Sequence, residues 1–509
     1  MKAKIFIFLT LLIFNNFQAF SQCNVELTLV SQDQVDSFLV GFPDCTTING
    51  NVFIGNGITG TTDITNLNAF SNITTITGYL YIYSNPLLTN LNGLNSLMHV
   101  GGNLQIQGNL ALTDIFGLNS LQTVGSSSVF SSIDINDNDA LSSFSLNSLQ
   151  SIGGIFSVGG NNSLTNFSAN ALQNAGIIDQ QQAVGGIHVG NNNLLSTFSL
   201  NSVTIAGERL QIENSPSLLN FNLSSLQDVG SYVAIQYNTL LTSFNLNSLT
   251  NVGTFILILD NDSLLSVNLN SVIDVGVQAG SYGNVEILGN NILTTINLSS
   301  LQQIDEYLKI NDNNALTNIN LNSLENIDGY LEIGNNDALV NLNNLNGLVS
   351  VSGAVTIAGN DSLNNISGLQ QINPTTVTGL YIYDNLVLSI CELPNICTYL
   401  NYPVNTYPRV IDNNIGNCLN EAAVLYACGN LSLDNFENKE VSVYPNPFTN
   451  VLYFSSKFRQ VEVFSSDGKK VLNEKNTFKI ETEKLPWGIY FLTGIYDDDK
   501  RISYKLVKF

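Results

Sequence analysis

The chain has 509 residues, too many for one ordinary domain and enough for about three structural units. Only 11% of the residues are charged and 44% are hydrophobic, which excludes a disordered polyelectrolyte and a coiled coil. Between residues 50 and 400, Arg209 and Lys309 are the only basic residues, against 23 Asp and Glu. This acidic region lacks the cations that neutralise phosphates. Nucleic acid and anionic membrane surfaces are therefore excluded as partners.

Residues 1–21 have the pattern of a cleaved signal peptide. A basic start precedes the apolar run 5–14, and Ala19 and Ser21 are the small residues expected at positions −3 and −1. The run is too short to span a bilayer, and no other stretch approaches the roughly 20 apolar residues of a transmembrane helix. We therefore expect an exported protein without a transmembrane segment.

Six cysteines flank the middle of the chain: Cys23, Cys45, Cys391, Cys397, Cys418 and Cys428. An exported chain meets oxidising conditions, so this even count favours disulfides. Cys23 with Cys45 is the natural first pair, and the other four allow three pairings. Zinc is the rival for those four, but the spacings C-x5-C, C-x20-C and C-x9-C match no standard zinc site.

The middle of the chain repeats one unit of 23–31 residues. Residues 208–230, 231–253 and 254–276 are consecutive copies with an apolar-x-apolar start and a closing x-Ser-Leu/Val-x-x-Val-Gly. Repeats of this length are typical of a β-solenoid or leucine-rich array, so we predict about 14 stacked parallel turns, here called rungs. The first apolar position of the rungs is Val52, Leu80, Leu104, Ile133, Phe156, Ile187, Leu210, Val233, Ile256, Val285, Leu308, Leu331, Val355 and Leu380.

Each rung is expected to contribute a strand such as Leu308-Lys309-Ile310, whose flanking residues point inward and whose middle residue points outward. An asparagine column, broken only by Ser215, recurs once per rung. An amide with donors and acceptors can satisfy backbone groups of the next rung, so we interpret this column as structural. Its members are Asn85, Asn109, Asn138, Asn161, Asn192, Asn238, Asn261, Asn290, Asn313, Asn336, Asn360 and Asn385.

The segments SQDQVDSFLVGFPDCTTINGNVFI (31–54) and GLNSLMHVGGNLQI (93–106) resemble the receptor L domain and its bacterial secreted relatives. The resemblance implies a right-handed β-helix at 50–388, an N-terminal cap at 22–49 and a cysteine-rich C-terminal cap at 389–430. Ser31 to Val40 would form a short helix in the first cap, with Ser31 as N-cap and Gln34 completing a capping box. The solenoid is longer than a receptor L domain, so receptor-type ligand binding is not expected.

Residues 441–509, after a linker at 431–440, resemble the C-terminal sorting domain of type IX secretion. The segments VSVYPNPFTNVLYF (441–454), LPWGIYFL (485–492) and YKLVKF (504–509) carry this resemblance. It implies a small β-sandwich, export across the outer membrane, and as partners the secretion machinery and a sortase-like peptidase. The motif residues are Tyr444, Pro445, Asn446, Pro447, Gly468, Gly488, Tyr490, Lys505 and Lys508.

A polysaccharide lyase or hydrolase is the alternative function, because such enzymes also use β-helices. Its best catalytic cluster is His188 with Arg209 and Glu213, which alternation places on one outward face. A solvated polar patch explains the same residues, because a shared fold does not imply a shared function. We therefore favour a non-enzymatic protein and expect no cofactor.

Aspartate-rich turns at 134–139 and 260–262 raise the possibility of structural calcium. The first resembles the start of an EF-hand loop, but it lacks the glycine at position six and the glutamate at position twelve. No motif supports a metal, so ordinary polar turns are the favoured interpretation.

A recognition surface remains as the expected function, on a protein displayed at the cell surface or released. Outward aromatic pairs, Tyr81 with Tyr83 and Tyr381 with Tyr383, are expected near the two ends of the sheet. Three insertions, at 126–131, 177–184 and 277–282, fall at one corner of the solenoid and are the favoured binding edge. Because the solenoid is acidic, the ligand is expected to be a neutral or cationic glycan or protein.

Overall fold

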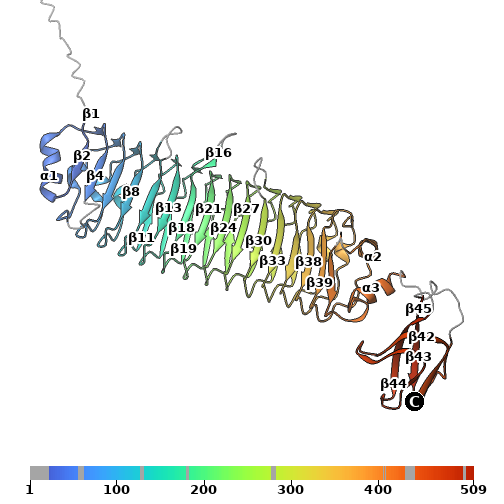
Figure 1. The fold of residues 1–509 in the computed structure, drawn as a ribbon. Helices are drawn as coiled ribbons and strands as arrows, with labels where there is room; N and C mark the ends of the chain where they lie inside the picture. Colours follow the sequence, from blue (N-terminus) through green and yellow to red (C-terminus); the bar gives the residue numbers. More distant parts are fainter. Residues whose placement is uncertain are drawn as a thin grey trace, which may run out of the picture. The chain divides into compact units, whose positions relative to one another are not determined.

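The computed structural model describes residues 22–55, 62–125, 131–178, 183–276, 283–404, 406, 408–429, 442–496 and 500–509. The chain divides into two compact units, residues 1–428 and 429–509 (Figure 1). The signal peptide expected at 1–21 and the linker expected at 431–440 lie outside the described residues.

The first unit is built on a sheet of 16 parallel strands, here called the wide sheet (Figure 1). All 14 predicted rungs contribute a strand. Two further strands, β2 and β40, extend the sheet into the caps, where the repeat does not predict them. The strands are β2 Leu27–Leu29, β4 Val52–Gly55, β6 Leu80–Tyr83, β8 Leu104–Gln107, β10 Ile133–Asn136, β13 Ile155–Gly159, β18 Gly186–Gly190, β21 Arg209–Glu213, β24 Tyr232–Gln236, β27 Phe255–Leu259, β30 Asn284–Leu288, β33 Tyr307–Asn311, β36 Leu331–Gly334, β38 Ala354–Ala358, β39 Gly379–Tyr383 and β40 Arg409–Asp412.

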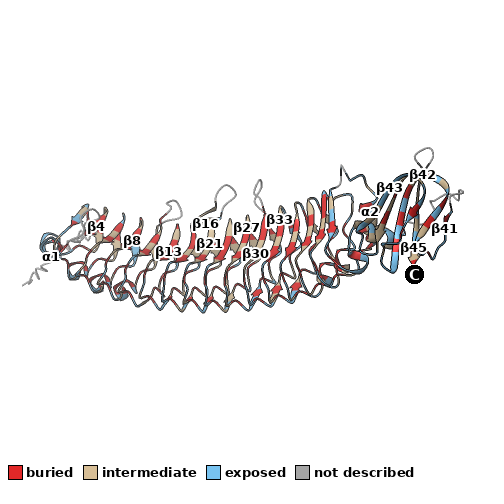
Figure 2. Ribbon diagram, turned by 60° about the horizontal axis from the view of Figure 1, so that its bottom comes forward, coloured by how far each residue is buried: buried red, intermediate tan, exposed pale blue. Residues whose placement is uncertain are grey.

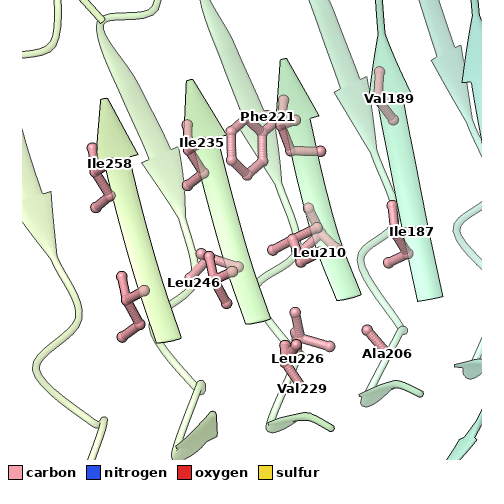
Figure 3. Packing of buried hydrophobic residues seen from close by; sticks show 14 of the residues in the cluster. Ile187, Val189, Ala206, Leu210, Phe221, Leu226, Val229, Ile235, Leu246 and Ile258 are labelled. Atoms are coloured by element: carbon pink, nitrogen blue, oxygen red, sulfur yellow. The ribbon is translucent and has the colours of Figure 1, made fainter. Parts of the chain in front are cut away.

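Side chains alternate across the wide sheet as predicted. Leu308 and Ile310 are fully buried, while Lys309 between them is partly exposed. Figure 2 shows the same alternation of buried and intermediate residues along the wide strands. Figure 3 shows inward residues of successive rungs packed together, Ile187 and Leu210 of the wide sheet among them. Burial of one such side chain contributes about 2 kcal/mol, and the repeat multiplies this contribution rung by rung.

A second sheet, here called the narrow sheet, has 14 strands of two residues each. Each strand puts one residue into the core and leaves one partly exposed or exposed. The strands are β1 Gln22–Cys23, β3 Thr47–Ile48, β5 Thr75–Ile76, β7 His99–Val100, β9 Thr123–Val124, β12 Ser151–Ile152, β15 Asn174–Ala175, β20 Ile205–Ala206, β23 Asp228–Val229, β26 Asn251–Val252, β29 Asp274–Val275, β32 Gln303–Ile304, β35 Asn326–Ile327 and β37 Ser350–Val351.

The central rungs carry a third strand each, arranged in a five-stranded and a three-stranded sheet. Five phenylalanines stack inside the larger one with ring centroids 5.0–5.6 Å apart: Phe144, Phe167, Phe198, Phe221 and Phe244. The strands are β11 Ser143–Ser145, β14 Asn166–Ser168, β19 Thr197–Ser199, β22 Asn220–Asn222, β25 Ser243–Asn245, β28 Ser266–Asn268, β31 Thr295–Asn297 and β34 Asn318–Asn320.

In the outer rungs, 3-10 helices replace these third strands, a difference that a single repeat template does not predict. Three of these helices contain Gly93, Gly117 or Gly368, where an added Cβ would lie 1.7–1.8 Å from a carbonyl oxygen of the preceding rung. Only glycine permits that approach. The helices are η1 Asn68–Phe70, η2 Asn92–Leu94, η3 Phe116–Leu118, η4 Asn343–Leu345 and η5 Ser367–Leu369.

The asparagine column is a buried hydrogen-bond ladder, as predicted, and it continues one rung further to Asn414. Asn313 is typical of its members. Its amide nitrogen donates to the Ile287 carbonyl of the preceding rung at 2.9 Å, and its amide oxygen accepts from the Asn290 backbone at 3.1 Å. Its own backbone N–H donates to the Asn336 side chain of the following rung at 3.2 Å. Each asparagine therefore joins three rungs.

Both caps are closed by disulfides. Cys23 pairs with Cys45, as predicted. The alternatives left open at the other end resolve into the pairs Cys391–Cys418 and Cys397–Cys428. The N-terminal cap contains helix α1 (Gln32–Gly41), and the C-terminal cap contains α2 (Pro394–Leu400), η6 (Gly416–Cys418) and α3 (Glu421–Ala427).

Helix α1 begins at the predicted N-cap, Ser31, whose hydroxyl accepts from the Gln34 backbone at 3.4 Å. The Gln34 side chain accepts from the Val30 N–H at 2.6 Å instead of closing the box on Ser31. The helix therefore starts as expected, with its reciprocal bond shifted by one residue.

The second unit is an antiparallel sheet of five strands. The long strand β42 pairs with β41, β43 and β44, and β45 completes the order at the C-terminus. Phe458, Val461 and Leu492 are fully buried in its own small core. The strands are β41 Val443–Tyr444, β42 Val451–Ser465, β43 Lys470–Glu481, β44 Gly488–Tyr496 and β45 Lys500–Lys508.

Replacement of Asn313 by Ala should destabilise the solenoid by about 3 kcal/mol, because at least two buried backbone groups lose their partner. Urea unfolding followed by circular dichroism measures this. Asn314→Ala is the matched control, since Asn314 is the exposed neighbour in the same turn, and should change the free energy of unfolding by less than about 0.5 kcal/mol. Equal effects of the two changes would contradict the role of the ladder.

Replacement of Ser215 by Asn should have the opposite effect. Ser215 accepts from Asn192 and donates to the Glu213 carbonyl, but it has no amide to reach the Val189 carbonyl of the preceding rung. An asparagine would supply that bond and should raise the free energy of unfolding by about 1 kcal/mol. A decrease would show that the site lacks room for the amide.

Candidate recognition surface

The outward face of the wide sheet carries three columns of side chains. On each strand, the residues before, between and after the two inward residues form the first, second and third outward columns. Strand register places every residue of the expected surface in these columns. Arg209 lies in the first column, Tyr81, His188 and Tyr381 lie in the second, and Tyr83, Glu213 and Tyr383 lie in the third.

His188 and Glu213 meet, but Arg209 does not join them. The His188 Nε2 atom lies 3.3 Å from Glu213 Oε1, and its Nδ1 atom lies 3.5 Å from the Ser157 hydroxyl. Arg209 lies opposite Gly186 and Tyr232 in register, and its buried Nε atom has no hydrogen-bond partner. The expected three-residue cluster is therefore a hydrogen-bonded pair, with both ring nitrogens of His188 facing partners in the sheet.

The carboxylates around His188 have pKa values shifted in opposite directions. Burial acts to raise the pKa of Glu213, but hydrogen bonds from Gln236, Gln211 and His188 outweigh it and lower the pKa. Burial raises the pKa of Asp134, and the nearby His188 offsets this only in part. Glu213 is thus held as a carboxylate, whereas Asp134 is disfavoured in that form.

An aromatic group lies on β4, β6 and the residue before β6. The Tyr79 and Tyr81 rings are stacked with centroids 5.4 Å apart, and Phe53 meets Tyr81 edge to face at the same distance. The Tyr83 hydroxyl donates to Gln105 at 3.0 Å, and burial, with Tyr81 and Asp134 nearby, raises the pKa of Tyr83 to about 12. Sequence reasoning found Tyr81 and Tyr83 and missed Tyr79 in the first outward column.

Tyr381 and Tyr383 lie on β39, which is not the last strand. Val410 and Asp412 of β40 lie opposite them in register. The Tyr381 ring lies over Gly379, where an added Cβ would be 2.8 Å from it. These tyrosines are therefore one strand from the end of the sheet, and the Tyr81 pair is two strands from the other end.

The middle of the face carries two ring stacks that the sequence analysis missed. Tyr232 and Phe255 stack at 4.8 Å with an interplanar angle of 2°, and Tyr307 and Tyr330 stack at 4.4 Å with an angle of 7°. Both pairs join successive rungs, so the ring faces point along the stacking direction and the ring edges point toward solvent. All four rings occupy the first outward column, and that position in the repeat is the signal that could have identified them.

Acidic side chains accompany the second of these stacks. Glu286 accepts from the Tyr307 hydroxyl at 2.6 Å, and Glu332 lies 3.4 Å from Lys309 Nζ. Burial, reinforced by the hydrogen bond to Glu286, raises the pKa of Tyr307. We name Glu286, Tyr307, Lys309, Tyr330 and Glu332 the central group.

The corner insertions are described only in part. Residues 126–130, 179–182 and 277–282 lie outside the described residues. The flanks of the second insertion form a two-stranded antiparallel hairpin of β16 (Ile177–Ile178) and β17 (Ala183–Val184) (Figure 1). Whether these insertions bind a ligand stays a prediction.

The aspartate-rich turns have a structural explanation. Asp137 and Asp260 lie at the corner before the asparagine ladder, where φ is +57° and +52°. Glycine, asparagine or aspartate occupies most rungs at this corner, because these residues tolerate the left-handed region best. Asp139 and Asp262 accept hydrogen bonds from Asn162 and Asn291 at 2.7 Å. Within the described part of the chain, no group of three or more His, Cys, Asp or Glu could hold a metal ion.

The expected sorting motif converges on the C-terminal strand of the second unit. The Asn446 side chain donates to the Lys505 carbonyl at 2.8 Å and accepts from the Val507 N–H at 2.9 Å. Lys508 is 5% exposed, and its ammonium group donates to the Thr449 carbonyl at 2.7 Å and to that of Thr482. The motif therefore fastens the Tyr-Pro-Asn-Pro segment to β45.

The other motif residues have different surroundings. Tyr490 is buried and donates to the Pro486 carbonyl at 2.7 Å, while Tyr444 is half exposed beside Tyr453. Pro445 and Pro447 follow cis peptide bonds, and Gly488 has φ of +155°. Gly468 has φ of +76° in the turn between β42 and β43, where glycine is favoured.

Glu213 and Asp134 should respond to pH with opposite signs. A lowered pKa means that Glu213 stabilises the fold above its ordinary pKa of about 4.3 and loses this contribution as the pH falls through the lowered value. A raised pKa means that Asp134 costs stability as the pH rises above its ordinary value of about 3.9. At pH 7, Glu213→Gln should therefore destabilise and Asp134→Asn should stabilise. Urea unfolding from pH 3 to 8 checks this, and either difference persisting at full size at pH 3 would contradict it.

Comparisons with known proteins confirm both resemblances over limited ranges. Residues 44–102 match the family model of the receptor L domain, and residues 442–508 match that of the secretion system C-terminal sorting domain. No curated protein matches the chain. Among solved structures, the chain is similar to one titled "Crystal structure of TLR13-ssRNA13 complex", with 14% identity over 72% of this chain and 69% of that chain. The TM-score is 0.15, so this likeness carries no structural argument.

No helix within the described ranges is long and apolar enough to cross a membrane. The sorting-domain match means that the chain is exported by type IX secretion to the cell surface or extracellular space.

Proposed function

We propose that this chain is a non-enzymatic recognition or adhesion protein whose solenoid captures a protein ligand through basic residues. The observation that carries the proposal is the central group, where two carboxylates and two stacked tyrosines share one outward face. A receptor L domain match and an export tail are consistent with a binding role outside the cell.

The ring geometry favours a protein over a glycan. Sugars stack on the faces of aromatic rings, but Tyr307 and Tyr330 are stacked on each other and turn their edges outward. The tyrosine hydroxyls at these outward edges are hydrogen-bonding groups, which suit polar side chains better than apolar sugar faces. The nearby carboxylates add an attraction for lysine and arginine.

The non-enzymatic part of the proposal is supported by the His188 pair. A lyase needs a base and a cation that neutralises the substrate carboxylate. Glu213 and Ser157 engage both nitrogens of His188, and Arg209 does not reach the pair. Loss of any polymer-degrading activity in His188→Ala would favour the enzyme instead.

An oligolysine peptide is a direct probe of the central group. We expect the full chain to bind it, and Glu286→Gln/Glu332→Gln to weaken binding about tenfold, since two partly exposed ion pairs are worth about 0.5–1 kcal/mol each. Biolayer interferometry at low ionic strength measures the dissociation constant.

Asp228→Asn/Asp274→Asn is the matched control. It removes two charges from the narrow sheet, in rungs of the same solenoid, and should leave the dissociation constant within about twofold of the unchanged chain. An equal loss of affinity in both variants would show that net charge alone determines binding, and it would overturn the central group as the binding site. Capture of neutral dextran without capture of oligolysine would overturn the choice of a protein ligand in favour of a glycan.

A further inference from the structure

The second unit has an exposed aromatic surface that its core does not require. Trp487, Ile489, Phe491 and Phe509 are 85%, 42%, 46% and 70% exposed. We name these four residues the outer patch. Exposed apolar side chains that cluster in this way are uncommon on a protein without a partner, because each one costs hydration free energy.

Strand register brings the outer patch together. Ile489 lies opposite Val507 and Phe491 lies opposite Lys505 across β44 and β45. On the other side, Phe491 lies opposite Phe464 of β42, so one row of outward side chains crosses three strands. Trp487 and Phe509 flank the Gly488–Lys508 pair at the end of the same two strands.

Two motif residues, Tyr490 and Lys508, lie on the other side of these strands, whereas the motif residue Lys505 lies on the side of the patch. Tyr490 and Lys508 are buried, and their polar groups bond to backbone carbonyls of the same unit. Alternation therefore separates two roles along β44 and β45. The inward residues hold the fold together, and the outward residues are free to contact another protein.

The charges beside the outer patch indicate the chemistry of its partner. Lys505 is exposed at the patch and has no ion-pair partner among the described residues, whereas Lys470 over Phe464 is already paired with Glu462 at 2.7 Å. Residues 442–509 hold 11 basic and eight acidic residues, in contrast to the acidic solenoid. The complementary surface is therefore apolar with an acidic rim.

We infer that the outer patch is the surface by which the type IX export machinery binds this chain, through an apolar site that supplies a carboxylate to Lys505. The match of residues 442–508 to a sorting domain identifies the class of partner, and the patch and Lys505 specify the contact. The inference does not depend on the ligand of the solenoid.

Export of the full chain in a bacterium with type IX secretion tests the inference. We expect Ile489→Ser/Phe491→Ser to lower the amount outside the outer membrane about tenfold, as for loss of an interface anchor, with the retained protein in the periplasm. Phe478→Ser is the matched control, since Phe478 is a 55% exposed aromatic residue on β43 away from the patch, and should be exported normally. Normal export of the double variant, or equal retention of both, would overturn the inference.

Two further measurements separate recognition from folding. The tail of the retained double variant should resist limited proteolysis as the unchanged tail does, and Ile489→Val/Phe491→Leu, which keeps the surface apolar, should be exported. Failure of this conservative variant would overturn the inference.

Lys505→Glu should reduce export several-fold more than Lys505→Arg. Equal export of the two variants would overturn the inference that the partner supplies a carboxylate to Lys505. Sedimentation of the purified chain as a dimer that Ile489→Ser/Phe491→Ser dissociates would favour a second copy of the chain instead.

Discussion

The solenoid depends on one buried hydrogen-bond ladder. At the corner after each wide strand, the chain leaves the sheet and an asparagine bonds backbone groups of the neighbouring rungs. Each asparagine connects three rungs, because its amide donates to the preceding rung and accepts from it while its own backbone bonds to the next. The ladder therefore fixes the register of the stack. The three insertions at 126–131, 177–184 and 277–282 enter at another corner, before a wide strand.

A fixed register turns single outward residues into columns, and this explains both what the sequence predicts and what it misses. Inward positions obey one rule, since they are apolar in every rung, and so all 14 rungs and the burial of residues such as Ile310 could be predicted. Outward positions obey no such rule. The stacking of Tyr307 on Tyr330 follows only when both are seen in one column at rung spacing. Arg209 shares the outward face with His188, as alternation predicted, but it lies opposite Gly186 and Tyr232 in register, because a shared face does not by itself bring two side chains into contact.

The caps show a second limit of the repeat. Strands β2 and β40 pair with their neighbours although each matches only part of the template, because the edge of a parallel sheet offers backbone partners to any extended segment. Disulfide pairing likewise depends on which cysteines the cap helices bring together, and spacing alone left three choices. In the second unit, the motif identified important residues but did not indicate their structural roles. Tyr490 and Lys508 are internal supports, while Trp487 and Phe509, outside the motif, are exposed.

The hydrogen bonds between rungs have a mechanical consequence for a protein displayed outside a cell. They run along the stacking direction, so a pull on the two ends of the solenoid would load the rungs in series, and the weakest rung would open first. The ladder has fewer hydrogen bonds at Ser215, where a hydroxyl replaces an amide. A 23-residue rung rises about 4.8 Å when stacked and extends to about 80 Å when pulled out. Opening of a single rung would therefore lengthen the chain by about 75 Å. This extension would lower the tension from a sudden load before the other rungs opened.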